Sequence, residues 1–384
     1  MYRRILQPPE NKSFFLFGPR GTGKTTWLKT RFPGALYFDL LDADVYNDFL
    51  ARPTRLSQRI PERFQDIVVL DEVQRVPALL HEVHRLIESR RQTFALTGSS
   101  ARKLKRGDIN LLAGRALTLQ MHPLTAHELG NDFTIRHALQ LGHLPSTFQE
   151  ENPHAYLESY VTTYLREEVQ QEGLTRNLGA FSRFLETASF SQANLLNVSA
   201  VARECAVNRK VAEQYVTILE DLLLAVRIPA FTKKAKRRLI SHPKFFFFDA
   251  GIYRALRPRG PFDTAEDIDG AALETAVFQE LRAMNDYGDY GYRMFFWRAV
   301  SGREVDFVLY GERGLIAIEV KRSERVTTAA CAGLKSFLHD YPETSAYMIY
   351  GGDKEYWEDN IHVLPIGKFF AQSDVLLQNH TNQI

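Results

Sequence analysis

A glycine-rich segment near the N-terminus ends in a lysine and threonines, residue types that together can bind a triphosphate. It comprises Gly18, Pro19, Arg20, Gly21, Thr22, Gly23, Lys24, Thr25 and Thr26. Glycines let the backbone curl so that its N–H groups point at phosphate oxygens. We expect Lys24 to reach the β- and γ-phosphates and the Thr25 hydroxyl to bind Mg²⁺. The apolar run at residues 14–17 predicts a strand entering this loop. The helix predicted after the loop would add the positive end of its dipole.

Two adjacent carboxylates follow a second apolar run. Residues 67–70 are all apolar, and Asp71 and Glu72 come directly after them. Such a strand places carboxylates at the C-terminal edge of a parallel sheet, where ligands bind. We expect Asp71 to hold Mg²⁺ through water, and Glu72 to orient and deprotonate an attacking water. The two segments together predict a site that binds and hydrolyses a nucleoside triphosphate.

Short apolar runs alternate with helical stretches through the first third of the chain. Strands are predicted at residues 14–17, 35–38, 67–70, 93–97 and 116–119. Between the third and fourth of these, apolar residues recur at the spacing of one helix face. Strand, helix and strand in this order predict an α/β fold with a parallel sheet covered by helices, within a first domain at residues 1–135.

These segments resemble an AAA+ ATPase, with a Walker A loop, a Walker B strand and a third strand with polar residues at its end. The resemblance implies ATP and Mg²⁺ as cofactors and Ser99 as the sensor of the γ-phosphate, with Thr97 as second choice. It also implies that Arg115 is an arginine finger acting in a neighbouring copy, which requires a homo-oligomer such as a ring. The alternative for Arg115 is a surface or salt-bridged arginine. No sensor-2 arginine can be assigned.

The middle of the chain, residues 150–258, has the element order of a winged helix-turn-helix. A short helix at residues 197–206 is followed by a turn, a longer helix at residues 209–222 and two strand-like runs. Basic side chains on the second helix and on the connection between the two runs are candidates for contacts with DNA phosphates. They are Arg209, Lys210, Lys233, Lys234, Lys236, Arg237 and Arg238. The alternative is that this region serves as a packing module.

A third group of candidate residues lies near the C-terminus. Asp306 is on an alternating strand, and Glu319 and Lys321 end the next strand, two residues apart on one face. If the strands are adjacent, two carboxylates can bind divalent ions while the lysine aligns a water against a phosphodiester. The ordinary alternative is an ion pair between Glu319 and Lys321.

This arrangement resembles the PD-(D/E)xK nuclease superfamily and implies a restriction-endonuclease-like α/β domain at residues 264–384. The resemblance adds Glu274, four residues after a glycine, to a site for Mg²⁺ or Mn²⁺ formed with Asp306 and Glu319. Glu280 is a rival because it lies on an apolar helix face. The whole chain also resembles a family that joins an AAA+ module to a C-terminal domain of unknown function. Residues 257–263, with two prolines and a glycine, predict the boundary before this domain.

The amino-acid composition limits the class of protein to which this chain can belong. The net charge is +2, and 45% of the residues are hydrophobic, enough for packed cores. The two cysteines and the absence of an apolar run of about 20 residues predict a cytoplasmic protein without a membrane segment. We interpret the chain as an ATPase that couples its nucleotide cycle to a DNA-associated domain, which either cleaves DNA or acts as a non-cleaving switch. A protein-remodelling ATPase without a nucleic-acid role is a third hypothesis.

Overall fold

The computed structural model describes residues 2–99, 112, 114–164, 169, 177–232, 242–261 and 263–378. The chain divides into two compact units. The first comprises Met1–His122 with Asp221–Leu224, and the second comprises Pro123–Glu220 with Ala225–Ile384. No helix among the described residues is both long enough and apolar enough to cross a membrane.

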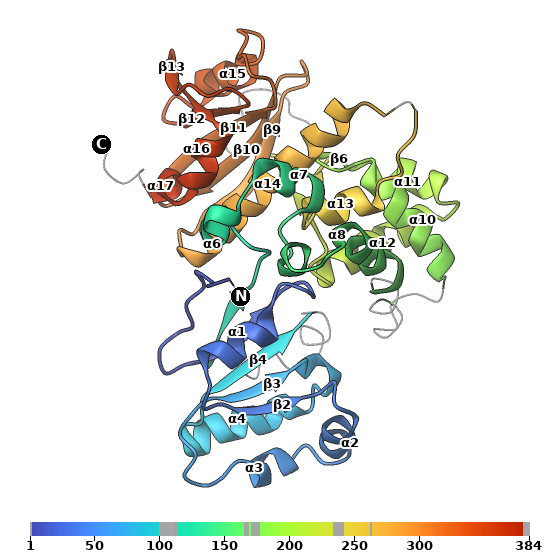
Figure 1. Cartoon of the computed structure of the whole chain (residues 1–384), viewed down its shortest axis with the longest axis vertical. Coiled ribbons are helices and arrows are strands. Elements are labelled where there is room, and N and C mark those ends of the chain that lie inside the picture. Colours follow the sequence, from blue (N-terminus) through green and yellow to red (C-terminus); the bar gives the residue numbers. More distant parts are fainter. Residues whose placement is uncertain are drawn as a thin grey trace. The chain divides into compact units, whose positions relative to one another are not determined.

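The first unit is built on a five-stranded sheet in which every neighbouring pair of strands is parallel (Figure 1). The strand order is β2-β3-β4-β1-β5. Its elements are β1 (Ser13–Phe17), α1 (Lys24–Arg31), β2 (Leu36–Asp39), α2 (Ala43–Ala51), α3 (Arg55–Arg59), β3 (Val68–Asp71), η1 (Val73–Arg75), α4 (Leu79–Arg90), β4 (Phe94–Gly98) and β5 (Ala116–Gln120). All five predicted strands are present, displaced by at most one residue.

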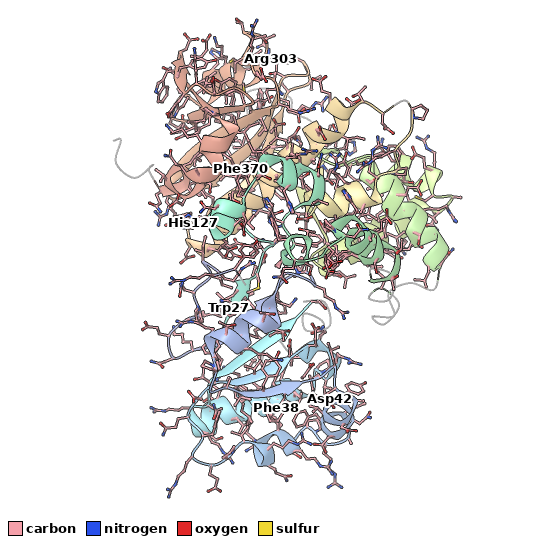
Figure 2. The ribbon with its side chains drawn as sticks, in the orientation of Figure 1. Trp27, Phe38, Asp42, His127, Arg303 and Phe370 are labelled. Atoms are coloured by element: carbon pink, nitrogen blue, oxygen red, sulfur yellow. The ribbon has the colours of Figure 1, made fainter. Side chains whose placement is uncertain are left out.

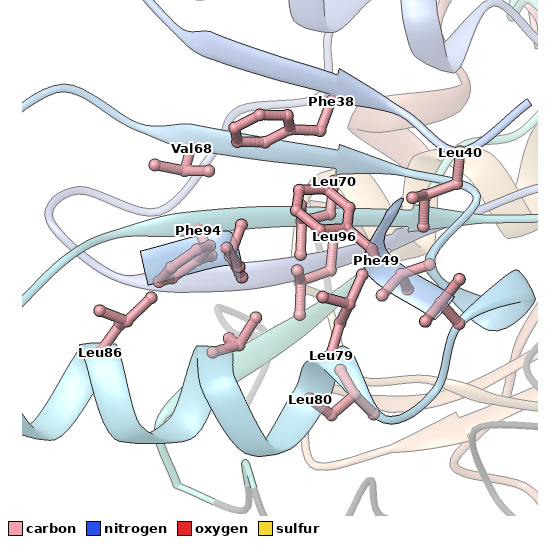
Figure 3. Packing of buried hydrophobic residues seen from close by; sticks show 14 of the residues in the cluster. Phe38, Leu40, Phe49, Val68, Leu70, Leu79, Leu80, Leu86, Phe94 and Leu96 are labelled. Carbon is pink, nitrogen blue, oxygen red and sulfur yellow. The ribbon is translucent and has the colours of Figure 1, made fainter. Parts of the chain in front are cut away.

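Helices cover both faces of this sheet, which explains why its central strands are apolar throughout. On one face, Phe14 of β1 packs edge-on against Trp27 of α1. Trp27 is labelled in Figure 2. On the other, the apolar stripe of α4 packs against alternate side chains of the strands, including Leu70 and Leu96 (Figure 3). Because strand side chains alternate between faces, each strand contributes to both cores. The predicted parallel sheet covered by helices is confirmed.

The first part of the second unit is mostly helical and contains a small antiparallel sheet of order β6-β8-β7. Its elements are α6 (Ala126–Leu129), η3 (Gly130–Asp132), α7 (Ile135–Leu141), η4 (Pro145–Phe148), α8 (Pro153–Ser159), η5 (Tyr160–Tyr164), α10 (Leu178–Ser189), β6 (Asn194–Leu195), α11 (Val198–Glu204), α12 (Arg209–Asp221), β7 (Ala225–Ile228), β8 (Lys244–Phe247) and α13 (Ala250–Leu256). The two predicted strand-like runs correspond to β7 and β8.

The rest of the second unit surrounds a six-stranded mixed sheet of order β13-β14-β12-β11-β10-β9. Its elements are α14 (Ala265–Tyr287), β9 (Arg293–Arg298), β10 (Glu304–Gly311), β11 (Gly314–Lys321), α15 (Ala332–Asp340), β12 (Ser345–Tyr350), β13 (Tyr356–Glu358), β14 (Ile361–Pro365), α16 (Ile366–Ala371) and α17 (Ser373–Gln378). β10 and β11 form an antiparallel pair, and β12 is parallel to β11. β9 precedes this pair in the chain and is antiparallel to β10.

Candidate functional site

The loop between β1 and α1 has a backbone that requires glycine. Gly21 and Gly23 have φ angles of 81° and 89°, in the left-handed region that a side chain disfavours. A Cβ on Gly18 would lie 2.4 Å from the carbonyl oxygen of Met121. Gly23 is also the N-cap of α1, and it has no side chain to accept from the N–H groups of the first turn. These groups can therefore face an anion, as the sequence predicts.

Lys24 is buried at this loop with its ammonium directed at backbone oxygens. Its Nζ donates hydrogen bonds to the carbonyls of Gly18 (2.7 Å) and Pro19 (3.2 Å). The hydroxyl of Thr22 donates to the same Pro19 carbonyl at 2.7 Å and braces the loop. Arg20, within the loop, and Thr26, in the first turn of α1, were also predicted as nucleotide-binding residues, and both are exposed.

The loop and the acidic strand meet at Asp71. Thr25 donates a hydrogen bond of 2.7 Å to Asp71 Oδ2, although 46 residues separate them. Two further hydroxyls, those of Tyr37 and Thr97, also donate to this carboxylate. The structure therefore brings the predicted Mg²⁺-binding pair, Thr25 and Asp71, into contact. Hydroxyl and carboxylate oxygens are the ligand types that Mg²⁺ takes, so these residues fit the ion.

Sequence reasoning missed Tyr37. It lies on β2, which pairs with β3, and burial together with the hydrogen bond to Asp71 raises the pKa of its hydroxyl. The hydroxyl is therefore protonated and available as a donor. The only sequence signal was the Tyr37 hydroxyl in an otherwise apolar predicted strand. No pattern of neighbouring residues in the sequence shows that β2 pairs with β3.

Glu72 is held by both candidate sensor residues. Its backbone N–H donates to Thr97 Oγ1 at 3.1 Å, while its carboxylate accepts from Ser99 Oγ at 3.3 Å and from Gln74 Nε2. Thr97 and Ser99 are both buried at the end of β4. Thr97 thus fixes the backbone of the acidic pair, whereas Ser99 contacts the side chain that is predicted to orient water.

Arg115 is exposed just before β5 and forms an ion pair with Glu88 of α4 in the same chain. This contact matches the alternative of a salt-bridged surface arginine. An ion pair between exposed side chains contributes little to stability, so it does not prevent Arg115 from turning to another partner.

Three family models match successive parts of the chain. Residues 10–130 match a family model described as an AAA domain. Residues 133–263 and 269–369 match two models described as domains of unknown function, DUF8612 and DUF4143. The loop, the acidic strand and the sensor strand all lie within the first match. Most of the first unit therefore lies within a match to an AAA domain.

Similarity to solved structures is weak. The ORC2 protein of Aeropyrum pernix in ADPNP–ADP complexes is 14% identical, covers 70% of this chain and 89% of its own, and has a TM-score of 0.33. The A. pernix ORC1 protein in complex with DNA is 13% identical, with 65% and 87% covered and a TM-score of 0.26. Protein VC1899 of Vibrio cholerae is 12% identical, with 95% and 97% covered and a TM-score of 0.25. These values are too low to transfer a function. No curated protein sequence matches the chain.

The second unit contains a pocket of about 540 Å³ that brings the predicted C-terminal residues together. Glu274 comes from α14, Asp306 from β10, and Glu319 and Lys321 from β11. Lys321 Nζ pairs with Glu319 Oε1 at 2.6 Å, which is the predicted ordinary alternative. A fifth member, Lys244 at the start of β8, was missed because it lies outside the segment that resembles a nuclease.

Lys244 is 1% exposed and is the central cation of this pocket. Its Nζ donates to Glu274 Oε2 at 2.7 Å and to Asp306 Oδ1 at 2.8 Å. Burial opposes its charge, yet the carboxylates of Asp306, Glu274 and Glu304 raise its pKa. Burial and the charge of Asp306 raise the pKa of Glu274 to about 8, and the same two causes raise the pKa of Glu319.

The predicted Mg²⁺ or Mn²⁺ site of Glu274, Asp306 and Glu319 is not formed by these side chains. In the part of the chain that the structure describes, no group of three or more His, Cys, Asp or Glu residues is arranged to hold a metal ion. The physical reason is that Lys244 bonds the carboxylate oxygens that the ion would need. The residues of this pocket therefore do not fit a divalent metal.

Glu280, the alternative to Glu274 as a metal ligand, lies outside this pocket. Glu280 is completely buried on α14, where it accepts hydrogen bonds from the N–H of Ala126 (2.9 Å) and the hydroxyl of Ser373 (3.0 Å). It joins α14 to α6 and α17 and does not line the pocket. Of the two candidates left open by the sequence, Glu274 is the one that the structure places beside Asp306.

The candidate DNA contacts can be placed only in part. Arg209 and Lys210 are exposed at the start of α12. Lys233, Lys234, Lys236, Arg237 and Arg238 lie outside the described residues. On β7, Arg227 pairs with Glu213 and Glu220 of α12, so this basic side chain is already neutralised within the fold.

Proposed function

We propose that this protein binds and hydrolyses ATP in its first unit and uses the nucleotide cycle to switch a DNA-associated second unit that does not cleave DNA. The observation that carries the first part is the hydrogen bond from Thr25 to Asp71, which joins the glycine loop to the acidic strand. The AAA domain match over residues 10–130 supports the same assignment.

The chain's own side chains divide the work of hydrolysis. Bound Mg²⁺ supplies charge neutralisation at the β- and γ-phosphates. Thr25 and Asp71 would hold the ion, and Lys24 would bind phosphate oxygens in place of the loop carbonyls. Glu72 accepts a proton from the attacking water, in an orientation set by Thr97 at its backbone and Ser99 at its carboxylate.

A neighbouring copy would complete the site. We propose that Arg115 leaves Glu88 and reaches the γ-phosphate bound by the next subunit, in a ring or other homo-oligomer. Its exposure and its weak ion pair support this role, because little free energy is needed to release it.

The second unit supports DNA association through its element order. Helices α10, α11 and α12 with the three-stranded sheet β6-β8-β7 are in the order of a winged helix. Exposed Arg209 and Lys210 begin the helix that would face DNA. The bonds of Lys244 in the acidic pocket favour the switch over metal-dependent cleavage, which is the second candidate.

The ATPase assignment is tested with two substitutions. Lys24→Ala should abolish ATP binding in calorimetry, because the loop loses Lys24, its only buried cation among the described residues. Glu72→Gln should keep ATP binding but lose turnover by at least about 100-fold. Arg31→Ala, an exposed basic residue at the end of the same helix, is the matched control and should behave as the unsubstituted protein. Full hydrolysis by both test variants would refute the assignment.

DNA association and cleavage need separate measurements. Single-stranded and duplex DNA are incubated with ATP and Mg²⁺ or Mn²⁺, and both retention and nicking are recorded. Retention that weakens in Arg209→Ala/Lys210→Ala, without nicking, is the expected result. Nicking that disappears in Asp306→Ala would establish the nuclease instead. No retention of any DNA would favour a protein-remodelling ATPase.

A further inference from the structure

The ammonium of Lys244 lies where several carboxylates converge. Besides its bonds to Glu274 and Asp306, it is 3.5 Å from Glu304 Oε1. The side chain is 1% exposed, so water does not compensate its charge. A lysine buried to this extent requires partners of opposite charge, and these three carboxylates provide them.

The oxygens that a divalent ion would need are already engaged. Asp306 uses Oδ1 for Lys244 and Oδ2 for the N–H of Val320 at 3.0 Å. Glu319 uses Oε1 for Lys321 at 2.6 Å. Among the described residues, Glu319 Oε2 is buried without a hydrogen-bond partner and lines the same pocket. A divalent ion requires several oxygens at about 2.0–2.6 Å, and one unengaged oxygen from this carboxylate pair does not satisfy it.

We propose that Lys244 is the resident cation of this pocket and takes the position of a divalent metal, so that the pocket excludes Mg²⁺ and Mn²⁺ while Lys244 remains in place. The metal ligands would be Glu274 Oε2, Asp306 Oδ1 and Glu319 Oε2. The first two are the atoms that Lys244 bonds, so ion and ammonium compete for the same oxygens. Glu319 Oε2 has no other partner among the described residues and would complete the three metal ligands when Lys244 is removed.

The latent metal site is tested on the 384-residue chain without nucleotide, independently of ATP hydrolysis. Binding of Mn²⁺ is measured by calorimetry and by the electron paramagnetic resonance of free Mn²⁺. The unsubstituted protein should show no binding that depends on Asp306, so it should match Asp306→Asn. Lys244→Gln should bind one Mn²⁺ at least about tenfold more tightly than the unsubstituted protein, because a positive charge beside the ligands is removed. The double variant Lys244→Gln/Asp306→Asn should lose this gain.

Two controls separate the position of Lys244 from loss of charge in general. Lys335→Gln removes an exposed lysine paired with Asp359 and should leave Mn²⁺ binding unchanged. Lys244→Arg keeps a cation in the pocket and should also bind no Mn²⁺. Circular dichroism establishes that each variant is folded.

Two results would overturn the proposal. One is Mn²⁺ binding by the unsubstituted protein that Asp306→Asn abolishes, a measurement that does not depend on whether Lys244→Gln folds. The other is a folded Lys244→Gln that gains no binding, because the lysine would then not be what excludes the metal.

Discussion

The backbone N–H of Glu72 donates a hydrogen bond of 3.1 Å to the hydroxyl of Thr97, 25 residues further along the chain. Glu72 has a φ angle of 60°, a left-handed conformation that non-glycine residues adopt rarely and at a cost of about 1 kcal/mol or more. The same Thr97 hydroxyl donates to Asp71. The buried side chain of Thr97 therefore holds both Asp71 and Glu72 where the chain turns after β3.

Thr97 should matter more for catalysis than Ser99, which reverses the order preferred from the sequence. Thr97→Val has nearly the same shape but leaves the N–H of Glu72 without its acceptor and removes one of the three hydroxyls that donate to Asp71. We expect kcat to fall by about 10- to 100-fold, as for other partners of metal ligands. The free energy of unfolding should decrease by about 1–3 kcal/mol. Ser99→Ala removes one contact with the Glu72 carboxylate and should have the smaller effect on kcat.

Steady-state kinetics at saturating ATP, together with calorimetric ATP affinity, distinguish the two hydroxyls. Both variants should keep their affinity for ATP, because neither side chain belongs to the phosphate loop. A larger loss of kcat in Ser99→Ala than in Thr97→Val would restore Ser99 as the principal sensor.

Tyr37 should tune the affinity for Mg²⁺. Its hydroxyl donates to the oxygen of Asp71 that also accepts from Thr25. Tyr37→Phe removes this orienting bond and should raise the Mg²⁺ concentration needed for half-maximal hydrolysis by about tenfold. The affinity for ATP measured in EDTA should be unchanged. Tyr46→Phe, whose ring packs under Arg75 in the same unit, is the control. Equal Mg²⁺ dependence in both variants would mean that Tyr37 has only a packing role.

Arg115 and Glu88 form a pair that separates a catalytic role from a structural one. Arg115→Ala and Glu88→Gln break the same exposed ion pair, so both should leave the melting temperature nearly unchanged. If Arg115 acts in a neighbouring subunit, only Arg115→Ala should lose ATP turnover. Mixing it with Glu72→Gln should recover part of the activity, because some interfaces then combine an intact Glu72 with an intact Arg115. Equal activity of the two single variants would remove Arg115 from the mechanism.

Local pattern was sufficient to predict the elements that carry the nucleotide site. Residues 13–17 form a buried strand followed by the glycine-rich loop, and residues 68–71 form a buried strand that ends in Asp71. Each of these signals lies within a few consecutive residues. Tyr37 was not predicted, because its role depends on which strands are neighbours in the sheet. That order is set by packing between segments far apart in the sequence.

The same limit applies to the acidic pocket. Glu319 and Lys321 were predicted to share a face, since the alternation of a strand fixes this over two residues. Lys244 is 62 residues from Asp306, on a strand predicted to belong to a different domain, so no local pattern connects them. The metal prediction counted the carboxylates without the cation that the fold brings among them.

Glu280 should make the stability of the protein depend on pH. Burial, with contributions from Glu128 and Asp374, raises its pKa in the folded protein to about 8, whereas an unfolded glutamate has a pKa of about 4.3. Below the unfolded value the side chain is neutral in both states, and its contribution to stability is fully present. As pH rises toward the folded pKa, the unfolded state ionises first, and stability falls by up to about 1.4 kcal/mol per pH unit.

Glu280→Gln should remove this dependence while keeping the contacts. The amide oxygen can accept from Ala126, and the amide N–H can donate to Ser373. The melting temperature of the variant, relative to the unsubstituted protein, should therefore increase steadily from pH 5 to pH 8. Glu343→Gln, at an exposed position, should show no such trend. A difference between Glu280→Gln and the unsubstituted protein that stays constant across this range would mean that Glu280 is already ionised in the folded state.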